Sequence, residues 1–390
     1  MDDEDDVSSE EDPVDLLPLP ADEKQTFHSA SSILQLLESV NHMMDGFGED
    51  RPPSPAESDT NHDQAAVTWP HLPRVETTDL KSLERRLRVV DVAAVRACVD
   101  IYFERLNPLY PVLLENEFRM QMEDFFASSE NSPPGSSPSL EIAQFTSLLY
   151  SILAIVKVST SECRNDDIVP GWEDFNRAES ILFRLLWLGG GNLMTLQCLC
   201  LKAHYFYFLG KADVAYDVIG RAVRLLLQLG LHSQPHWSHL GPYETEKRVR
   251  LFWTVFCLEH VLSFQSGAPA LLREEDTNVA LPGDYEDRLL FPDLPLPEKV
   301  PYRSTGPFIR TLIKWAQLCN ECWRNMFSPN ARKSDCEEFE GIMDARIRYL
   351  MKHIPAHLQW ETAVTASDEP TDVPAFVRSQ SFGLYMVSTV

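Results

Sequence analysis

From residue 92 onward, apolar side chains recur at steps of three and four residues, the spacing of one face of an α-helix. The first such face ends before the sequence NPLYP at 107–111, because proline cannot continue a helix. Its members are Val92, Val95, Val99, Tyr102 and Leu106. No segment shows a convincing alternation with a period of two, which a half-buried strand would require. The pattern therefore predicts an all-α fold.

The remaining helices follow from the same periodicity. The stretch 141–159 is apolar on nearly every side, which predicts a helix buried in the core. Segments 193–209 and 212–229 are joined by a short Leu-Gly-Lys turn and predict an antiparallel helical hairpin. The proline-rich stretch 282–301 is the main irregular insertion. Further helices are expected at 173–188, 243–264, 306–326, 336–353 and 374–390.

The segment 243–264 is the most informative of these helices. Its apolar residues, among them Phe252 and Trp253, cover more than half of the helix circumference, which places it in the core. Lys247, Arg248 and Arg250 lie in its first turns, where cations oppose the helix dipole. We therefore expect compensating acids, either Glu244 and Glu246 nearby or an acid from another helix. By physical chemistry alone this segment is a structural centre.

The N-terminal part of the chain has a different composition. Residues 1–63 hold 18 Asp and Glu against two Lys and Arg, so this part carries −16 of the net charge of −25. Isolated apolar residues at helical spacing interrupt the acids between 31 and 47, and we expect contact with a partner at Leu36, Leu37, Val40, Met43 and Phe47. Such a composition is typical of disordered segments that fold against a partner, as transcriptional activation segments do. The alternative is a solvated tail with one helix packed on its own domain.

These patterns divide the chain into three parts. We expect an acidic, disordered arm at 1–65, a linker at 66–90 and a helical domain at 91–390. The acidic balance argues against direct DNA binding, because affinity for duplex DNA depends on Lys and Arg neutralising phosphates. The start MDDEDD is unlike a signal peptide, and the longest uncharged run, Leu185 to Leu201, is too short and too glycine-rich to cross a membrane. The sequence predicts a soluble, intracellular protein that does not contact a membrane.

The sequence contains no motif that indicates catalysis, and its candidate metal ligands are better explained as structural residues. The chain has no nucleophile elbow, phosphate loop or metalloprotease helix, so we expect no enzyme. The pair of thiols in CNEC at 319–322 lies in a core-type helix and has no obvious fourth ligand for zinc, which favours buried, reduced thiols. LGGGN at 188–192 is interpreted as a turn between helices, and the histidines of HSQPHWSH at 232–239 as loop residues. We expect no catalytic residue, metal or cofactor in this chain.

Two neighbouring stretches carry a resemblance to a known family. VIGRAVRLLLQLGLH at 218–232 is followed by EKRVRLFWTVFCLEHVLSFQSGAPALLREEDTNVALP at 246–282, and this order is similar to the fungal-specific transcription factor domain. The likeness extends to YFERLNPLYPVLLENEF at 102–118, SLLYSILAIVKV at 147–158 and IPAHLQW at 354–360. That domain is the helical middle region of fungal zinc-cluster transcription regulators. The positions that carry the resemblance, which we expect to be structural, are Arg248, Arg250, Phe252, Trp253, Gly267, Pro269, Asp276 and Pro282.

The chain also departs from the family pattern. Such regulators carry a six-cysteine cluster that holds zinc next to a basic segment, but the first cysteine here is Cys98 and no cysteines have that spacing. Zinc is therefore expected only if an upstream zinc cluster exists. Glu259-His260 stands where the family usually has Asp-Arg, and Ala268 where Arg is common, so we expect a rewired buried ion pair. The chain ends inside a helical pattern, and we expect the domain to be truncated at its C-terminus.

The resemblance implies a nuclear regulator of RNA polymerase II transcription, with a metabolic or secondary-metabolite pathway as the expected target. Its partners would be the transcription machinery or another DNA-binding regulator, and DNA would be reached indirectly or through a missing module. Dimerisation stays open. The alternative is a helical-repeat interaction scaffold without a transcriptional role, which predicts a regular hairpin period that the sequence does not show.

Overall fold

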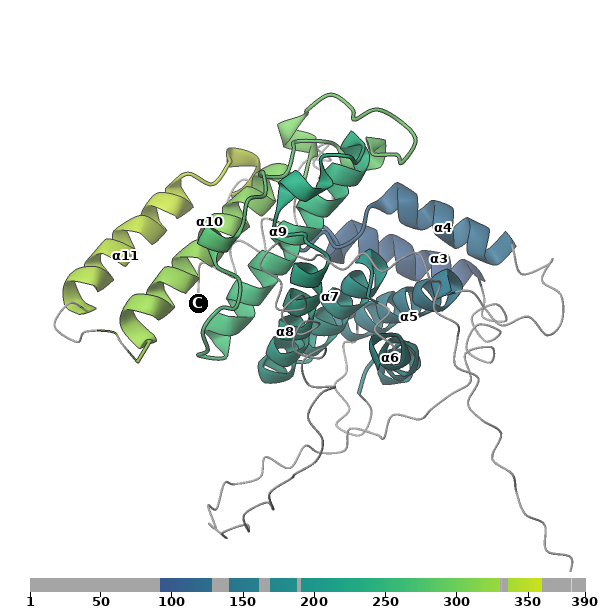
Figure 1. Cartoon of the computed structure of the whole chain (residues 1–390), viewed down its shortest axis with the longest axis horizontal. Helices are drawn as coiled ribbons and strands as arrows, with labels where there is room; N and C mark the ends of the chain where they lie inside the picture. Colours follow the sequence, from purple (N-terminus) through teal and green to yellow (C-terminus); the bar gives the residue numbers. More distant parts are fainter. Residues whose placement is uncertain are drawn as a thin grey trace, which may run out of the picture.

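The computed structural model of the chain is all-α in the part that it describes (Figure 1). The described residues are 92–127, 140–160, 169–187, 191–329, 331, 336–359 and 380. They contain no strand, and the two isolated bridges are Ser233 with Asn278 and Tyr285 with Lys299. The α-helices are α3 (Val92–Ile101), α4 (Glu115–Ala127), α5 (Leu140–Thr160), α6 (Trp172–Trp187), α7 (Leu193–Phe208), α8 (Ala212–Gln228), α9 (Pro242–Gln265), α10 (Gly306–Cys322) and α11 (Cys336–Lys352).

The helices α5 to α9 and α11 begin and end within one residue of the bounds that periodicity predicts, so these predictions are confirmed. The helix α6 ends at Trp187 and α7 begins at Leu193, and most of the predicted turn at 188–192 lies outside the described residues. The predicted arm, the linker and almost all of the predicted helix at 374–390 lie outside the described residues.

Two predicted helices end in a wider turn than expected. The helix that begins with α3 continues as the π-helical turn η1 (Tyr102–Leu106), and α10 continues as the π-helical turn η7 (Trp323–Phe327). In each case a proline, Pro108 or Pro329, follows two residues after the turn and offers no N–H for a further helical bond. Hydrophobic spacing does not distinguish such a turn from a final α-helical turn, because the side chains stay on nearly the same face.

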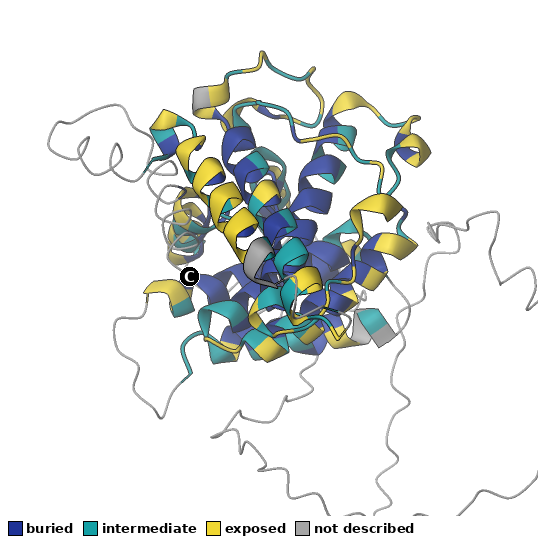
Figure 2. Cartoon of the chain, turned by 90° about the vertical axis from the view of Figure 1, so that its left-hand side faces the viewer, coloured by how far each residue is buried: buried dark blue, intermediate teal, exposed yellow. Residues whose placement is uncertain are grey.

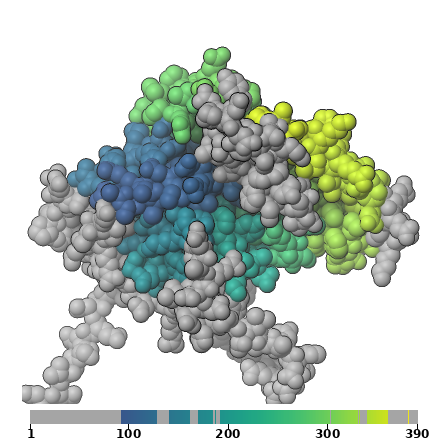
Figure 3. Space-filling view, turned by 180° about the vertical axis from the view of Figure 1, so that it is seen from behind, coloured from purple at the N-terminus to yellow at the C-terminus, as the bar shows by residue number. Residues whose placement is uncertain are grey.

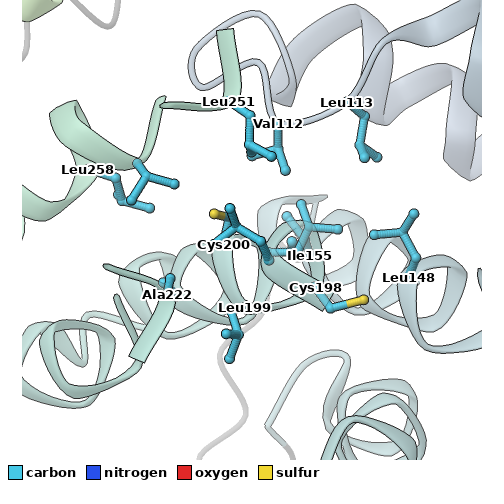
Figure 4. Close-up of a cluster of buried hydrophobic side chains, with 14 of the residues drawn as sticks. Val112, Leu113, Leu148, Ile155, Cys198, Leu199, Cys200, Ala222, Leu251 and Leu258 are labelled. Carbon is cyan, nitrogen blue, oxygen red and sulfur yellow. The ribbon is translucent and has the colours of Figure 1, made fainter. Parts of the chain in front are cut away.

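The core is centred on α5 and α7. The helix α5 packs on α6 and α7, α7 forms the predicted hairpin with α8, and α9 packs on α8 and α10. Side chains of α5, α7, α8 and α9 meet those of the loop before α4 in one apolar cluster, which includes Val112, Leu148, Cys200, Ala222 and Leu258 (Figure 4). Deleting a large side chain from such a cluster costs about 2–5 kcal/mol, because the surroundings close the cavity only in part.

The helix α5 is long and apolar enough to cross a membrane by length and composition alone. However, 78% of the relevant window is buried inside the fold, where α5 lies against α6 and α7. This confirms the prediction that 141–159 is a buried core helix.

The helix α11 forms one edge of the molecule in Figures 1 and 3. It packs on α10 and η7, and its outer face is exposed in Figure 2. Leu318 of α10 forms a small apolar cluster with Met343 and Leu350 of α11, and this cluster is separate from the main core. The helix α11 is thus attached to the rest of the domain mainly through α10.

Candidate functional site

Arg250 on α9 is only 1% exposed, whereas arginine is rarely buried unless it is paired. Its Nε donates to Glu246 Oε1 at 2.9 Å, and one terminal nitrogen forms an ion pair with Asp287. The other terminal nitrogen donates to the Tyr285 carbonyl at 3.3 Å. Burial alone would lower the pKa of Arg250, but Asp287 and Glu246 raise this pKa above its usual range. Arg250 is therefore a fixed cation that ties α9 to the irregular segment 267–305.

Two more contacts hold the same segment against α9. The Glu246 carboxylate accepts a hydrogen bond from the Gly283 backbone N–H at 3.1 Å. Trp253 is buried, and its indole N–H donates to the Ala280 carbonyl at 2.8 Å. Side chains on one face of α9 therefore satisfy backbone groups of a stretch that has almost no regular structure of its own.

Three other positions of the family resemblance, Gly267, Pro269 and Pro282, make different structural contributions. Gly267 has a φ of +64°, which glycine adopts without strain, and it ends α9. The Pro269 carbonyl accepts a hydrogen bond from the Tyr216 hydroxyl of α8 at 3.3 Å. The Pro282 carbonyl accepts one from Arg310 of α10 at 3.2 Å. These residues position the chain that leaves and re-enters the helical layers.

Phe252 and Asp276 lie at opposite extremes of burial. Phe252 is 0% exposed in the main core, as predicted for this face of α9. Asp276 lies in the short 3₁₀ helix η4 (Glu274–Asp276), is exposed, and takes no part in the network around Arg250. Asp276, which the family resemblance led us to expect as a structural residue, therefore lies outside the network around Arg250.

The cations at the start of α9 are paired with acids, as expected from their unfavourable position in the helix dipole. Lys247 forms an ion pair with Glu117 of α4, and Arg248 forms one with Glu244 on α9 itself. A cleft of about 220 Å³ opens beside Lys247 and Glu117, with Asn192 of the α7 start in its lining. Because the lysine and the glutamate of this cleft neutralise each other, it offers no net charge to a ligand.

Glu259 and His260, where the chain departs from the family pattern, are both buried. Glu259 Oε1 accepts from the Leu271 backbone N–H at 2.6 Å and from the Ser263 hydroxyl at 3.0 Å. His260 Nδ1 lies 3.0 Å from Glu259 Oε2 and 2.9 Å from the Phe256 carbonyl. The Glu259 carboxylate therefore holds the segment just after α9 through the Leu271 backbone N–H.

Asp287 is the residue of this site that sequence reasoning missed. It lies 37 positions after Arg250 in a proline-rich stretch without periodicity, so no spacing rule connects the two residues. The residues predicted to contact a partner, Leu36, Leu37, Val40, Met43 and Phe47, lie outside the described residues. Among the described residues, no group of three or more His, Cys, Asp or Glu is placed to hold a metal ion.

Comparison with known proteins places this helical region in a family context. Residues 99–334 match the family described as the fungal specific transcription factor domain. This range contains the whole α9 network and all eight positions that were expected to be structural, but not the stretch 354–360. No solved structure matches the chain.

Several characterised fungal proteins are similar over the same region. The ABC-transporter-regulating transcription factor of Aspergillus oryzae is 24% identical over 275 residues, which cover 69% of this chain and 29% of that protein. The transcriptional activator protein acu-15 of Neurospora crassa is 28% identical over 192 residues, covering 49% and 19%. The aurofusarin cluster transcription factor aurR2 of Gibberella zeae is 25% identical over 214 residues, covering 53% and 29%. The match with each of these relatives therefore spans less than a third of its length.

Proposed function

The chain belongs to the family of the fungal specific transcription factor domain, and on that premise we propose that its acidic arm activates transcription by RNA polymerase II under the control of its helical domain. As a member of a transcription factor family, the protein is not an enzyme. The observation that carries the proposal is the family match over 99–334, together with the buried ion-pair network around Arg250 inside it.

The arm supplies the activating part of this proposal. Residues 1–63 carry a net charge of −16, and apolar residues at helical spacing lie among the acids. A segment of this kind gains its structure when its apolar stripe is buried against a partner, and the surrounding acids keep it soluble before that. The partner would be a component of the transcription machinery that presents an apolar groove with a basic rim.

The similar proteins also support a proposal for the cell compartment and the target genes of this protein. Their names refer to the regulation of an ABC transporter and to the aurofusarin cluster, and we propose transporter genes or a metabolic gene cluster as the targets of this chain. The protein would act in the nucleus. It would reach DNA through a second module or through a DNA-binding regulator with which it pairs, since the acidic chain itself is poorly suited to phosphates.

Tethering the arm to an unrelated DNA-binding domain tests this proposal. We expect residues 1–66 to raise the transcript of a reporter gene on the order of tenfold, and residues 67–390 alone to leave it unchanged. Replacing Leu36, Leu37 and Phe47 together by Ala should abolish the rise, because the apolar stripe is lost while the charge is kept.

A matched control removes the same kind of side chain from a part of the arm that lacks helical spacing. The triple change of Leu16, Leu17 and Leu19 to Ala should keep most of the activation. Equal loss in both triple variants, at equal nuclear protein levels, would refute a helical contact surface at 31–47.

A further inference from the structure

A pocket of about 260 Å³ lies between α9, α10 and α11, and Tyr207 of α7 also lines it. It sits where the main core meets the separate cluster formed by α10 and α11. Its apolar walls come from all three helices: Val261 and Phe264 from α9, Trp315 from α10, and Met343 and Ile347 from α11. The pocket opens to solvent, and it is larger than the voids that close-packed protein interiors leave.

The chemistry of the walls selects the ligand. No charged side chain is among the described residues that line the pocket, so a carboxylate or phosphate would lose its hydration without gaining a counter-charge. Aromatic rings and a thioether are present instead, and these surfaces favour flat apolar molecules. The side chains of Tyr207 and Gln265 line the same space and make no hydrogen bond to another described residue, so each can orient one polar group of a ligand.

Two thiols also face the pocket, Cys319 and Cys322 of α10, one helical turn apart. Burial raises the pKa of Cys319 to about 12 and also raises the pKa of Cys322. Both thiols therefore stay protonated at neutral pH and behave as small apolar groups rather than as nucleophiles or metal ligands.

The size of the pocket sets the size of the ligand. An apolar cavity of about 150 Å³ holds benzene, so about 260 Å³ accommodates roughly ten non-hydrogen atoms. We propose that this pocket binds an uncharged, ring-containing small molecule of about that size, which joins α11 to α9. The helix α11 otherwise packs mainly on α10 and η7, so a ligand that touches Phe264 and Ile347 at once adds to the contacts that hold α11.

One residue that lines the pocket, Phe264, also contacts an exposed aromatic ring outside the pocket. Phe327 at the end of η7 is 62% exposed, and its ring lies edge-on to that of Phe264 at 6.4 Å. A π-helical turn at such a position is a frequent companion of functional sites. Ligand binding would thus change the contacts of α11 and of η7. Control of the acidic arm through these two elements rests on the proposed function.

Binding of 2-naphthol to the purified full chain tests the pocket, with calorimetry as the readout. This probe is an uncharged bicyclic ring with one hydroxyl, and 2-naphthoate is its charged counterpart. We expect 2-naphthol to bind one-to-one and 2-naphthoate to bind more weakly by roughly tenfold or more. Binding should also slow amide hydrogen exchange in α11, because the ligand joins this helix to α9.

Two variants on α11 locate the binding site. Ile347→Phe places extra volume in the pocket and should weaken 2-naphthol binding by roughly tenfold or more. Ile342→Phe makes the same change at a residue that is 47% exposed and outside the pocket, and it should bind 2-naphthol like the unmodified chain. Thermal unfolding of both variants confirms that they are folded.

Two outcomes would overturn the proposal. The first is a folded full chain that takes up no 2-naphthol at millimolar concentration. The second is equal binding of 2-naphthol by Ile347→Phe and by the unmodified chain. Because this assay involves no transcription, its failure leaves the reporter experiment standing, and a silent reporter leaves the pocket standing.

Discussion

Arg250→Met is expected to lower the free energy of unfolding of the described domain by about 3–5 kcal/mol, because it leaves buried carboxylates without their cation. Glu246 is 7% exposed and Asp287 is half-buried, so neither can recover full hydration in the variant. The segment 267–305 would lose its main attachment to α9. Denaturant unfolding followed by circular dichroism measures the change.

The matched control is Arg221→Met on α8. Arg221 pairs with Asp217 in an exposed i,i+4 arrangement, and such pairs contribute about 0.5 kcal/mol or less. A combined variant with Arg250→Met, Glu246→Gln and Asp287→Asn removes the unpaired charges, and it should recover part of the lost stability. Equal costs for Arg250→Met and Arg221→Met would show that the buried network does not stabilise the domain.

His204 on α7 is expected to make the domain less stable in weak acid. Burial lowers the pKa of His204 to about 4, although a hydrogen bond to the Cys200 backbone acts in the opposite direction. The ring packs against Tyr110 with a centroid distance of 4.8 Å, so it cannot reach water when it is protonated. In the unfolded chain the same histidine has a pKa near 6.5 and takes up its proton first as the pH falls.

The direction of the pH effect follows from this difference. The contribution of neutral His204 is complete above about pH 6.5 and is lost as the pH falls toward 4. Between pH 7 and pH 4.5 the loss amounts to about 2.5 kcal/mol. His204→Phe keeps the ring packing and should remove this part of the pH dependence, whereas His239→Phe at an exposed position should keep it. An unchanged pH dependence in His204→Phe would contradict the assignment.

Much of the helical architecture could be predicted from hydrophobic spacing. In α5, α7 and α9 the apolar side chains surround the helix, and only a helix in the core can bury all of them. Acidic partners for the basic residues at the start of α9 could also be predicted, because a cation at the N-terminus of a helix is unfavourable unless an acid neutralises it. Glu244 and Glu246 could be named for this reason, since they lie within four residues of the arginines.

Contacts across long sequence separations could not be predicted in this way. Asp287 has no periodic position, and the fold alone brings it to Arg250. The pocket is a further example, because Trp315 and Cys319 look like ordinary core residues until the spacing of α9, α10 and α11 leaves a space between them. The two π-helical turns are each followed by a proline two residues later, and the hydrophobic pattern does not mark either turn.

Control of the acidic arm by the helical domain is tested most directly by comparing two fusions in one reporter strain. Residues 1–66 and the full chain 1–390 are each tethered to the same unrelated DNA-binding domain, and the reporter transcript is measured at equal nuclear protein levels. We predict strong activation by 1–66 and a several-fold different level from the full chain, because the helical domain regulates the arm. Equal activation by 1–66 and by the full chain would contradict control of the arm by the helical domain, and transcript levels from both fusions that equal those of the DNA-binding domain alone would contradict a role in transcription activation.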